Sequence, residues 1–247
     1  MKPHSIISDK ICYIIGAGDN YGLDFVAQDG DLVIAADGGL TYLQQQGIVA
    51  DLVVGDFDSL PQKPTQPHVI ALSNIKDDTD MYAAVCEGIN RGYKVFYLYC
   101  GTGGRFEHTF ANIQTLASLS QHNMMGYLIG FDHCITAITN CGISFADCCR
   151  GFVSVFSYSD KATGVYLKGL KYELKNAILT NTFPIGVSNE FIGVESTIIV
   201  NDGTLMIVFP RGYNLQSARP SPVNRQNHIN LTEMPTGYIP PVLHSTD

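Results

Sequence analysis

The stretch DLVVGDFDS, residues 51–59, sets the interpretation of the whole chain. Its short apolar, partly β-branched run Leu52–Val54 is typical of a buried β-strand. Gly55 then allows a tight turn or a close approach to a ligand. Asp56 and Asp58 follow two residues apart, so in an extended backbone both carboxylates point to the same side. The stretch therefore predicts a buried strand that ends in a pair of carboxylates.

This pair of aspartates favours a bound cation. Two carboxylates at the mouth of a sheet repel each other unless a cation lies between them. Their oxygen-only donor set suits Mg²⁺, which typically binds one or two carboxylates and leaves its other positions to water and phosphate. The same pattern alone also fits a polar loop with an Asx turn, so the rest of the chain decides between the two interpretations.

Length and composition indicate a globular protein and exclude one class of partner. The chain has 247 residues, of which 45% are hydrophobic and 15% charged, and this is enough for a large core and two domains. The formal net charge is −8 and no run of Lys or Arg stands out, so we expect no nucleic-acid partner. An acidic protein can still bind nucleotides where a metal ion screens the phosphates.

Targeting and cysteine signals point to the cytoplasm. No segment reaches the ~18 apolar residues that span a bilayer, and the N-terminus lacks the pattern of a signal peptide. The seven cysteines include no Cys-x-x-Cys pair, so neither a disulfide framework nor a zinc site is predicted. We expect no membrane partner, a cytoplasmic location, and mostly buried cysteines that behave as small apolar side chains.

The first half of the chain alternates between strands and helices. Apolar runs predict strands at 11–15, 32–36, 52–54, 69–72 and 95–99, and helical spacing predicts helices at about 40–46, 81–89 and 109–120. Repeated strand–loop–helix units imply a parallel sheet that is covered by helices. In such folds ligands bind beyond the carboxyl ends of the strands. The polar loops at these ends are 16–20, 37–39, 56–59, 77–80 and 101–108.

The second half has a different character. From about residue 127 to residue 209 the pattern predicts short strands and no helix, which is typical of an all-β sandwich or small barrel. The Asn-Asp-Gly sequence at 201–203 predicts a hairpin turn between strands at 195–200 and 205–209.

The predicted fold class is therefore α/β, a parallel-sheet three-layer domain followed by an all-β sandwich. We divide the chain into an α/β nucleotide- and metal-binding part at 1–126, a β-sandwich part at 127–210 and a proline-containing tail at 211–247. The tail is expected to be an extended appendage.

Side chains suited to phosphate chemistry follow the predicted strands. Asp56, Asp58 and Asp80 could converge on one or two Mg²⁺ ions. Arg105 lies on a glycine-rich loop and could clamp a phosphate through its planar guanidinium, while the glycine backbone lets the phosphate approach closely. The Gly-x-x-x-x-Gly-Lys-Ser/Thr pattern of P-loop enzymes is absent. The loop before the helix predicted at 81–89 also offers an N-cap, either Asp78 or Thr79.

Taken in order, these motifs resemble those of the thiamine pyrophosphokinase family. The match in order and spacing runs from about residue 11 to residue 209. Each motif alone is weak, but together they are highly specific. The motifs that carry the resemblance are Ala36–Gly39, Asp51–Ser59, Lys76–Asp80, Gly103–Thr109, Gly164–Val165, Gly169–Tyr172 and Ser188–Glu190.

The resemblance implies an assembly and a reaction. It implies an α/β domain that carries the nucleotide and a β-sandwich, assembled as a homodimer. It also implies that ATP donates its β,γ-pyrophosphoryl group to the primary hydroxyl of thiamine in the presence of Mg²⁺, giving thiamine diphosphate and AMP. Thiamine would lie across the dimer interface, between the metal loops of one subunit and the β domain of the other.

The loops and the resemblance together assign the site residues. The predicted metal ligands are Asp56, Asp58 and Asp80. The predicted catalytic residues are Asp56, Asp58, Asp77, Asp80 and Arg105. Of these, Asp80 and Asp77 are the candidates to accept the hydroxyl proton, in competition with metal ligation. Residues predicted to bind the nucleotide, its phosphates or thiamine are Asp37, Gly38, Gly39, Lys76, Thr79, Arg105, His108, Ser188 and Asn189.

The chain departs from the family pattern at three places, one of which is the stretch Ser154–Ser157, where the family's proline is absent. Glu107 stands where the family usually has Asp, so the charge is retained but the side chain reaches one methylene farther. Some members place a Trp against thiamine, whereas this chain has no Trp. Met206 falls near that position, and a thioether can still pack against a ring.

Two other functions remain open from the sequence. The Asp-x-Asp pattern also fits a metal-dependent sugar-nucleotide transferase, which would transfer sugar without forming AMP from ATP. A catalytically impaired, regulatory thiamine-binding module would bind thiamine without forming AMP, and Glu107 keeps this alternative open. The order of the motifs favours the pyrophosphokinase.

Replacement of Asp58 tests the predicted metal site. Asp58→Asn removes ligand charge from a loop, so it is expected to nearly abolish turnover while the fold stays intact. AMP release measures the turnover, and circular dichroism with a thermal melt checks the fold. A folded variant with wild-type turnover would contradict the metal role.

Overall fold

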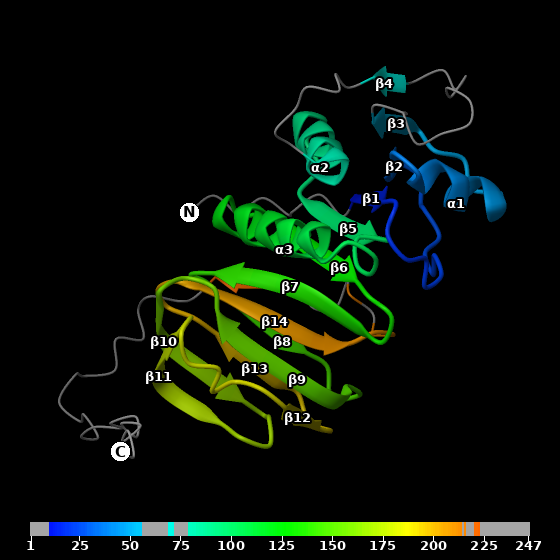
Figure 1. The fold of residues 1–247 in the computed structure, drawn as a ribbon. Helices are drawn as coiled ribbons and strands as arrows, with labels where there is room; N and C mark the ends of the chain where they lie inside the picture. The colour runs from blue at the N-terminus through cyan, green and yellow to red at the C-terminus, as the bar shows by residue number, and fades with distance from the viewer. Residues whose placement is uncertain (1–9, 56–68, 72–78, 214, 216–219, 223–247) are drawn as a thin grey trace, which may run out of the picture.

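The computed structural model describes residues 10–55, 69–71, 79–213, 215 and 220–222. Its largest element is a ten-stranded sheet, against which a five-stranded sheet packs. The helices of this part of the chain are α1 (Gly39–Gln45), α2 (Asp80–Asn90) and α3 (Phe106–Gln121) (Figure 1).

Six strands form a parallel half of the large sheet. They are β1 (Ile11–Ile15), β2 (Leu32–Ala36), β3 (Leu52–Gly55), β4 (Val69–Ala71), β5 (Val95–Tyr99) and β6 (Met125–Ile129). Their spatial order is β6-β5-β1-β2-β3-β4, and every neighbouring pair is parallel. The first five, β1 to β5, lie within a residue or two of the strands predicted for the first half of the chain. Both faces of such a half are covered, which explains the nearly continuous apolar runs.

The helices cover both faces of this half. Met81 and Val85 of α2 and Leu116 and Leu119 of α3 pack on one face, in a cluster that includes Ile14. α1 packs on the opposite face. None of the described helices is long and apolar enough to cross a membrane.

β6 joins the parallel half to an antiparallel half. It runs parallel to β5 on one side and antiparallel to β7 (His133–Thr139) on the other. The sheet continues through antiparallel pairs to β14 (Thr204–Pro210), β9 (Arg150–Ser157) and β12 (Asn189–Ile192). The sequence pattern grouped β6 with the sandwich, but its pairing makes it the last strand of the parallel half. The sheet thus runs unbroken across the predicted boundary, and the division into domains stays a prediction.

A second sheet closes a sandwich over the antiparallel half. Its strands are β8 (Cys141–Phe145), β10 (Lys161–Lys168), β11 (Leu174–Thr180), β13 (Ser196–Ile199) and β15 (Pro220–Pro222). They follow the order β11-β10-β13-β8-β15, and all the pairs are antiparallel. Ile143 and Ile198 from this sheet meet Val155, Ile207 and Phe209 from the large sheet in one core. The predicted fold class, α/β followed by a β-sandwich, is confirmed.

The hairpin predicted at 201–203 is wrong. β13 and β14 flank this turn, but they belong to different sheets, so the turn carries the chain between the two layers. It is held in place by the Gly203 N–H, which donates to Asn140 Oδ1 (2.9 Å). Gly203 has a φ of +111°. An Asn-Asp-Gly sequence favours a turn of the local backbone, but it does not determine which strands pair with each other.

The start of the tail is also different from its prediction. The residues after β14 dock on the fold through Arg211, and β15 adds an edge strand beside β8. An edge position tolerates proline because one side of the strand needs no backbone donor. The described part of the tail is therefore a structural segment, which composition alone did not indicate.

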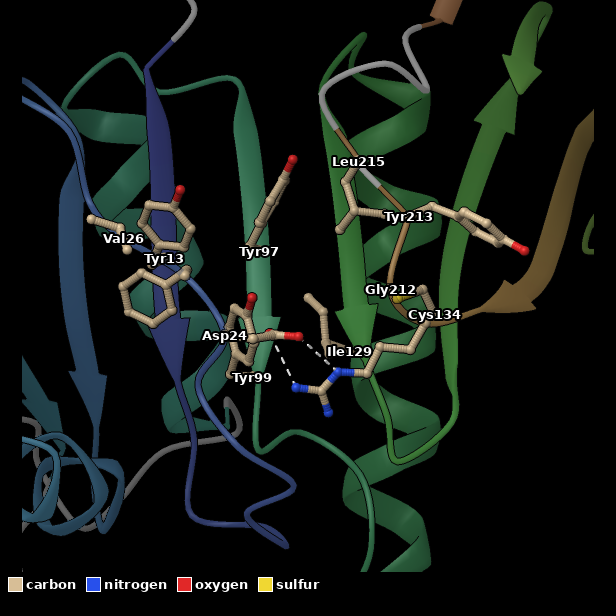
Figure 2. Close-up of a pocket in the computed structure, with 12 residues that line it drawn as sticks. Tyr13, Asp24, Val26, Tyr97, Tyr99, Ile129, Cys134, Gly212, Tyr213 and Leu215 are labelled. Atoms are coloured by element: carbon tan, nitrogen blue, oxygen red, sulfur yellow. Dashed lines mark hydrogen bonds and ion pairs between the residues drawn. The ribbon is translucent and has the colours of Figure 1, made fainter. Parts of the chain in front are cut away.

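A row of aromatic rings lines the face of the large sheet that α1 and the second sheet cover. Tyr13, Tyr97 and Tyr127, from neighbouring strands, meet edge to face with centroid distances of 5.5 and 5.3 Å. Phe25, from the loop after β1, stacks on Tyr13 at 4.2 Å. A cavity of about 480 Å³ lies between these rings and the residues that follow β14 (Figure 2).

No disulfide joins any of the seven cysteines, all of which lie within the described ranges, and most of them are buried. Burial raises the pKa of Cys100 and of Cys134 to about 12. These thiols therefore stay protonated at neutral pH and pack as small apolar side chains, as predicted. Cys148 is exposed, whereas the neighbouring Cys149 is buried and its pKa is raised by that burial.

Candidate active site

Two polar loops meet at the carboxyl-end edge of the parallel strands. The loop after β1 lies against the loop after β5 along a ladder of backbone hydrogen bonds. In this ladder Gly18 N donates to Cys100 O (2.8 Å) and Asp19 N donates to Thr102 O (3.0 Å). The ladder fixes both loops at the edge where ligands of such sheets bind.

Gly18 makes this close approach possible. A Cβ added to Gly18 would lie 2.6 Å from both Cys100 O and Thr102 O, so a side chain here would force the two loops apart. Tyr42 of α1 donates its hydroxyl to Gly18 O (3.0 Å) and holds the loop from the other side. Glycine-rich backbone held in this way is suited to the approach of phosphate.

The predicted motif Asp37–Gly39 leads from β2 into α1 at the same edge. Asp37 has a left-handed φ of 48°, and its N–H donates to Val54 O of β3 (2.8 Å). A Cβ on Gly39 would lie 1.9 Å from Ile15 O, so only glycine lets α1 begin directly against β1. The close packing of α1 against β1 therefore explains why position 39 is a glycine. The whole motif lies beside the loop after β1.

The start of α2 brings Thr79 and Asp80 to this edge. Thr79 is the N-cap, and its hydroxyl accepts from Tyr82 N (3.2 Å), which confirms the predicted cap. Asp80 is the first helical residue, so its carboxylate lies at the positive end of the helix dipole. The buried Met81 packs close to Gly16 and fixes the helix beneath the loop after β1.

Arg105 is exposed at the end of the glycine-rich loop. It is the N-cap residue of α3, and its Nε donates to Glu107 Oε1 at 2.6 Å. This hydrogen bond lowers the pKa of the Glu107 carboxyl. Glu107 is thus a partner of Arg105, whose side chain is 73% exposed and accessible to an anion. His108 is half-buried in the first turn of α3, where its N–H donates to Arg105 O (3.1 Å).

Asn112, which is not among the predicted site residues, holds the glycine-rich loop. Its side chain is buried in α3, and Nδ2 donates to Gly101 O at 2.7 Å. A buried amide on the apolar face of a helix needs a partner. An asparagine among the buried positions of a predicted helix was therefore a usable signal for this contact.

Four predicted site residues lie outside the described part of the chain: Asp56, Asp58, Lys76 and Asp77. The segments beside them reach the candidate edge, since β3 ends at Gly55 and α2 begins at Asp80. Within the described ranges no group of three His, Cys, Asp or Glu side chains could hold a metal ion. Two of the three predicted ligands fall outside those ranges, so the Mg²⁺ site stays a prediction.

Ser188 and Asn189 lie at the other end of the large sheet. Asn189 is buried at the start of β12, where Oδ1 accepts from Tyr172 N (2.9 Å) and Nδ2 donates to Tyr172 O (2.6 Å). Both polar atoms of this amide therefore hold the loop before β11. Ser188 is the exposed member of the pair, with a left-handed φ of 57° and an N–H that donates to Ser154 Oγ (3.0 Å).

Within one chain, Ser188 and Asn189 lie far from the residues at the carboxyl-end edge of the parallel strands. Asn189 is on β12 at one edge of the sheet, whereas Arg105 follows β5, with β9, β14, β7 and β6 between the two strands. Five steps across the sheet at about 4.8 Å each amount to roughly 24 Å. The predicted thiamine contacts are therefore remote from the edge that carries Asp80 and Arg105.

The prediction for Met206 needs correction. Met206 is 6% exposed and packs in the cluster beneath α3, together with Leu116 and Leu119. Neighbouring residues of β14 alternate between the two faces, and this position faces the helix layer. Met206 is therefore a core residue and does not present its thioether to a ligand.

Comparison with known proteins decides the family. The model of the thiamin pyrophosphokinase catalytic domain matches residues 24–128, and that of the thiamin pyrophosphokinase vitamin B1 binding domain matches residues 143–205. The chain belongs to the thiamin pyrophosphokinase family. The two matches cover about two thirds of the chain and confirm the resemblance seen in the motifs.

Individual relatives agree with this assignment. The thiamine pyrophosphokinase of Bacillus subtilis (strain 168) is 26% identical over 184 residues, which are 72% of this chain and 86% of that protein. The crystal structure of thiamine pyrophosphokinase from Bacillus subtilis has a TM-score of 0.73 at 26% identity, covering 81% of this chain and 99% of that one. Thiamin pyrophosphokinase from Geobacillus thermodenitrificans has a similar fold, with a TM-score of 0.72 at 24% identity over 83% and 99% of the chains.

The buried hydrogen bond of Asn112 tests how the edge is held together. Asn112→Ala leaves Gly101 O without this donor and is expected to lower the free energy of unfolding by about 1–3 kcal/mol. Turnover should fall as well, because the loop that precedes Arg105 loses an anchor. Denaturant unfolding measures the stability. Gln114→Ala, on the exposed face of the same helix, is the matched control and should cost less than about 0.5 kcal/mol. Equal stability of the two variants would rule out the anchoring role.

Proposed function

We propose that this protein catalyses the Mg²⁺-dependent transfer of the β,γ-pyrophosphoryl group of ATP to the hydroxyl of thiamine, with thiamine diphosphate and AMP as products. The observation that carries the proposal is the presence of a catalytic-domain match and a vitamin B1 binding match in one chain, in that order. Family membership also accounts for the Asp-x-Asp motif, so a sugar-nucleotide transferase is disfavoured.

The edge of the parallel strands supports the ATP side of the proposal. Gly18 lets two glycine-containing loops lie against each other, and backbone N–H groups in such loops suit phosphate oxygens. The exposed guanidinium of Arg105 can pair with a phosphoryl group through parallel hydrogen bonds. The N-terminus of α2 adds the positive end of a helix dipole at the same edge.

The proposed reaction is a displacement at phosphorus. The thiamine hydroxyl oxygen forms a bond with the β-phosphorus of ATP, while the bond from that phosphorus to the oxygen shared with the α-phosphate breaks and AMP leaves. The hydroxyl proton passes to a carboxylate, for which Asp80 and Asp77 are the proposed acceptors. Arg105 pairs with the negative charge on the transferred group, so the chain contributes mostly positioning and electrostatic stabilisation.

Asp56, Asp58 and Asp80 are the proposed ligands of Mg²⁺. All three offer carboxylate oxygens, the donors that Mg²⁺ prefers. Of the three, Asp80 lies within the described ranges, and it starts α2 at the candidate edge. When bound, Mg²⁺ neutralises phosphate charge. Asp80 is proposed for two roles, so ligation of the metal leaves Asp77 as the proton acceptor.

A homodimer would complete the site. The predicted thiamine residue Ser188 is roughly 24 Å from the phosphate edge by strand spacing, so thiamine between the two groups needs the β-rich half of a second chain. That half exposes several large apolar side chains, which is costly for an isolated chain. The exposed fractions run from 43% to 67%, for Phe152, Tyr172, Ile178, Phe183, Ile185 and Ile192. We propose that these side chains form the dimer interface.

A product assay tests the proposed function. Purified protein with ATP, MgCl₂ and thiamine is expected to form AMP and thiamine diphosphate in equal amounts, and EDTA should stop both. Thiamine monophosphate, in which the hydroxyl is blocked, is the matched control and should give no AMP. The sedimentation mass of the same sample should be that of two chains. Thiamine binding without AMP would instead support the regulatory alternative, and absence of both would contradict the proposal.

A further inference from the structure

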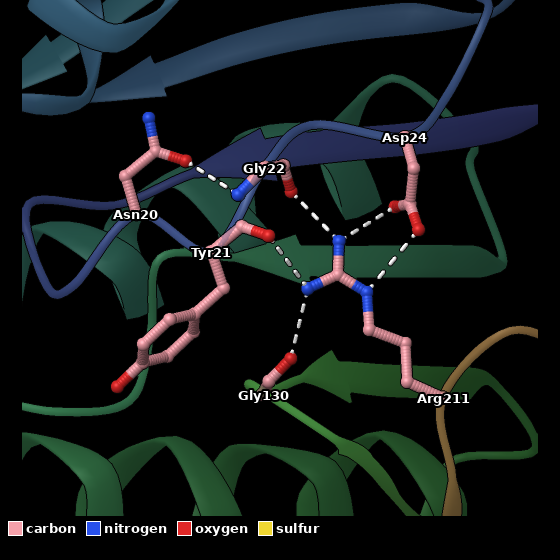
Figure 3. A network of polar contacts seen from close by, with 6 residues as sticks. All are labelled: Asn20, Tyr21, Gly22, Asp24, Gly130 and Arg211. Atoms are coloured by element: carbon pink, nitrogen blue, oxygen red, sulfur yellow. Dashed lines mark hydrogen bonds and ion pairs between the residues drawn. The ribbon is translucent and has the colours of Figure 1, made fainter.

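Arg211, the first residue after β14, makes a set of contacts that the proposed reaction does not use. Its Nε and Nη2 meet the two carboxylate oxygens of Asp24 at 3.2 and 3.0 Å. Nη1 donates to Tyr21 O (3.1 Å) and Gly130 O (3.0 Å), and Nη2 also donates to Gly22 O (2.8 Å). Figure 3 shows the guanidinium enclosed by these partners, and the side chain is only 14% exposed.

The chemistry of this network requires arginine. The planar guanidinium meets both carboxylate oxygens, one through the Nε hydrogen bond and the other through the Nη2 ion-pair contact, and still has donors for three carbonyls, which a lysine ammonium cannot reproduce. Burial alone would raise the pKa of the Asp24 carboxyl, but hydrogen bonds from Arg211 and Tyr99 outweigh it and lower this pKa. The Asp24 carboxyl is therefore ionised at neutral pH.

The network connects the β-rich half to the loop after β1. Arg211 continues β14, and Gly130 lies in the turn between β6 and β7. The other partners, Tyr21, Gly22 and Asp24, belong to the loop that begins at Gly16. Arg211 therefore ties this loop to the end of β14 and to the turn between β6 and β7.

The restraint passes along the loop to the candidate edge. Tyr21 donates its hydroxyl to Asp19 Oδ2 (3.0 Å), and Gly22 N donates to Asn20 Oδ1 (2.9 Å). Asp19 in turn donates its N–H to Thr102 O in the glycine-rich loop (3.0 Å). A continuous series of contacts thus leads from Arg211 to the loop that presents Arg105.

The two family matches leave out most of the residues that connect Arg211 to the loop after β1. The vitamin B1 binding match ends at residue 205, before Arg211, and the catalytic match begins at residue 24, after Tyr21 and Gly22. Most of the network is therefore built from residues outside both matched regions.

We propose that Arg211 is a positioning residue for ATP, which holds the loop after β1 in the shape that forms the nucleotide side of the site. This inference rests on the proposed function, because ATP is the ligand concerned. Arg211 acts through the loop and does not itself contact the reacting atoms. The predicted thiamine residue Ser188 lies in another part of the fold, so the effect should be confined to the nucleotide.

Kinetics separate this role from simple stabilisation. A contact that only stabilises the fold would reduce the fraction of active protein, which lowers kcat and leaves both KM values unchanged. For Arg211→Gln we expect the KM for ATP to rise about tenfold, equivalent to roughly 1.4 kcal/mol. The KM for thiamine and kcat should stay within about twofold of wild type.

Companion variants calibrate the effect. Arg211→Lys keeps the charge but loses the planar fork, so it should restore part of the ATP affinity. Asp24→Asn keeps the three carbonyl bonds of Arg211 and should raise the KM for ATP less than Arg211→Gln does. Arg91→Gln is the matched control, because Arg91 makes an exposed pair with Glu87 at the far end of α2 (3.7 Å) and should leave all constants unchanged.

A folded Arg211→Gln protein whose KM for ATP is within twofold of wild type would overturn the proposal. Where that variant fails to fold, Arg211→Lys and Asp24→Asn decide in the same way. A wild-type chain that forms no AMP would reject the proposed function separately. Calorimetric titration with ATP and MgCl₂ then tests Arg211: weaker binding by the Gln variant supports the proposal, and equal binding, or none by wild type, overturns it.

Discussion

β6 is hydrogen-bonded to a parallel strand on one side and to an antiparallel strand on the other, and the rest of the structure depends on this junction. On one side it aligns the parallel strands so that their carboxyl ends meet at one edge. On the other side it continues the same sheet into the sandwich. α3 packs across the junction, from Leu98 in the parallel half to Met206 in the antiparallel half. The two halves therefore share one continuous sheet and one helix that packs across it.

This continuous sheet explains why the predicted site residues lie in two separate groups. The loop that presents Arg105 is fixed at the parallel edge by the backbone ladder at Gly18 and by the amide of Asn112, and Asp80 is the first residue of α2 at the same edge. Ser188 is fixed on the far side of the sheet by its bond to Ser154. Because the sheet cannot fold over to join them, a site that needs both groups is best completed by a second chain.

Local signals predicted much of the fold. Five of the six parallel strands and the cap at Thr79 were found because strand burial and capping depend on neighbouring residues. Pairing depends on distant residues, so the turn at Gly203 was mistaken for a hairpin and β6 was grouped with the wrong half. The loops of the candidate site were predicted because parallel strands bring their carboxyl ends together. Asn112 was missed although its place among the buried positions of a predicted helix was a usable signal, whereas Arg211 was missed because an arginine in a tail acquires its role only from what it contacts.

The central claim, that each site combines the parallel edge of one chain with the β-rich half of another, is tested most directly by complementation. Asp58→Asn chains and Ser188→Arg chains, each inactive alone, would be unfolded together and refolded as a mixture. Half of the dimers would then contain one chain of each kind. In such a mixed dimer both defects fall in one of the two sites, because of the twofold axis, and the other site is intact. The account predicts recovery of about a quarter of the wild-type activity. A mixture no more active than its separate components would contradict it.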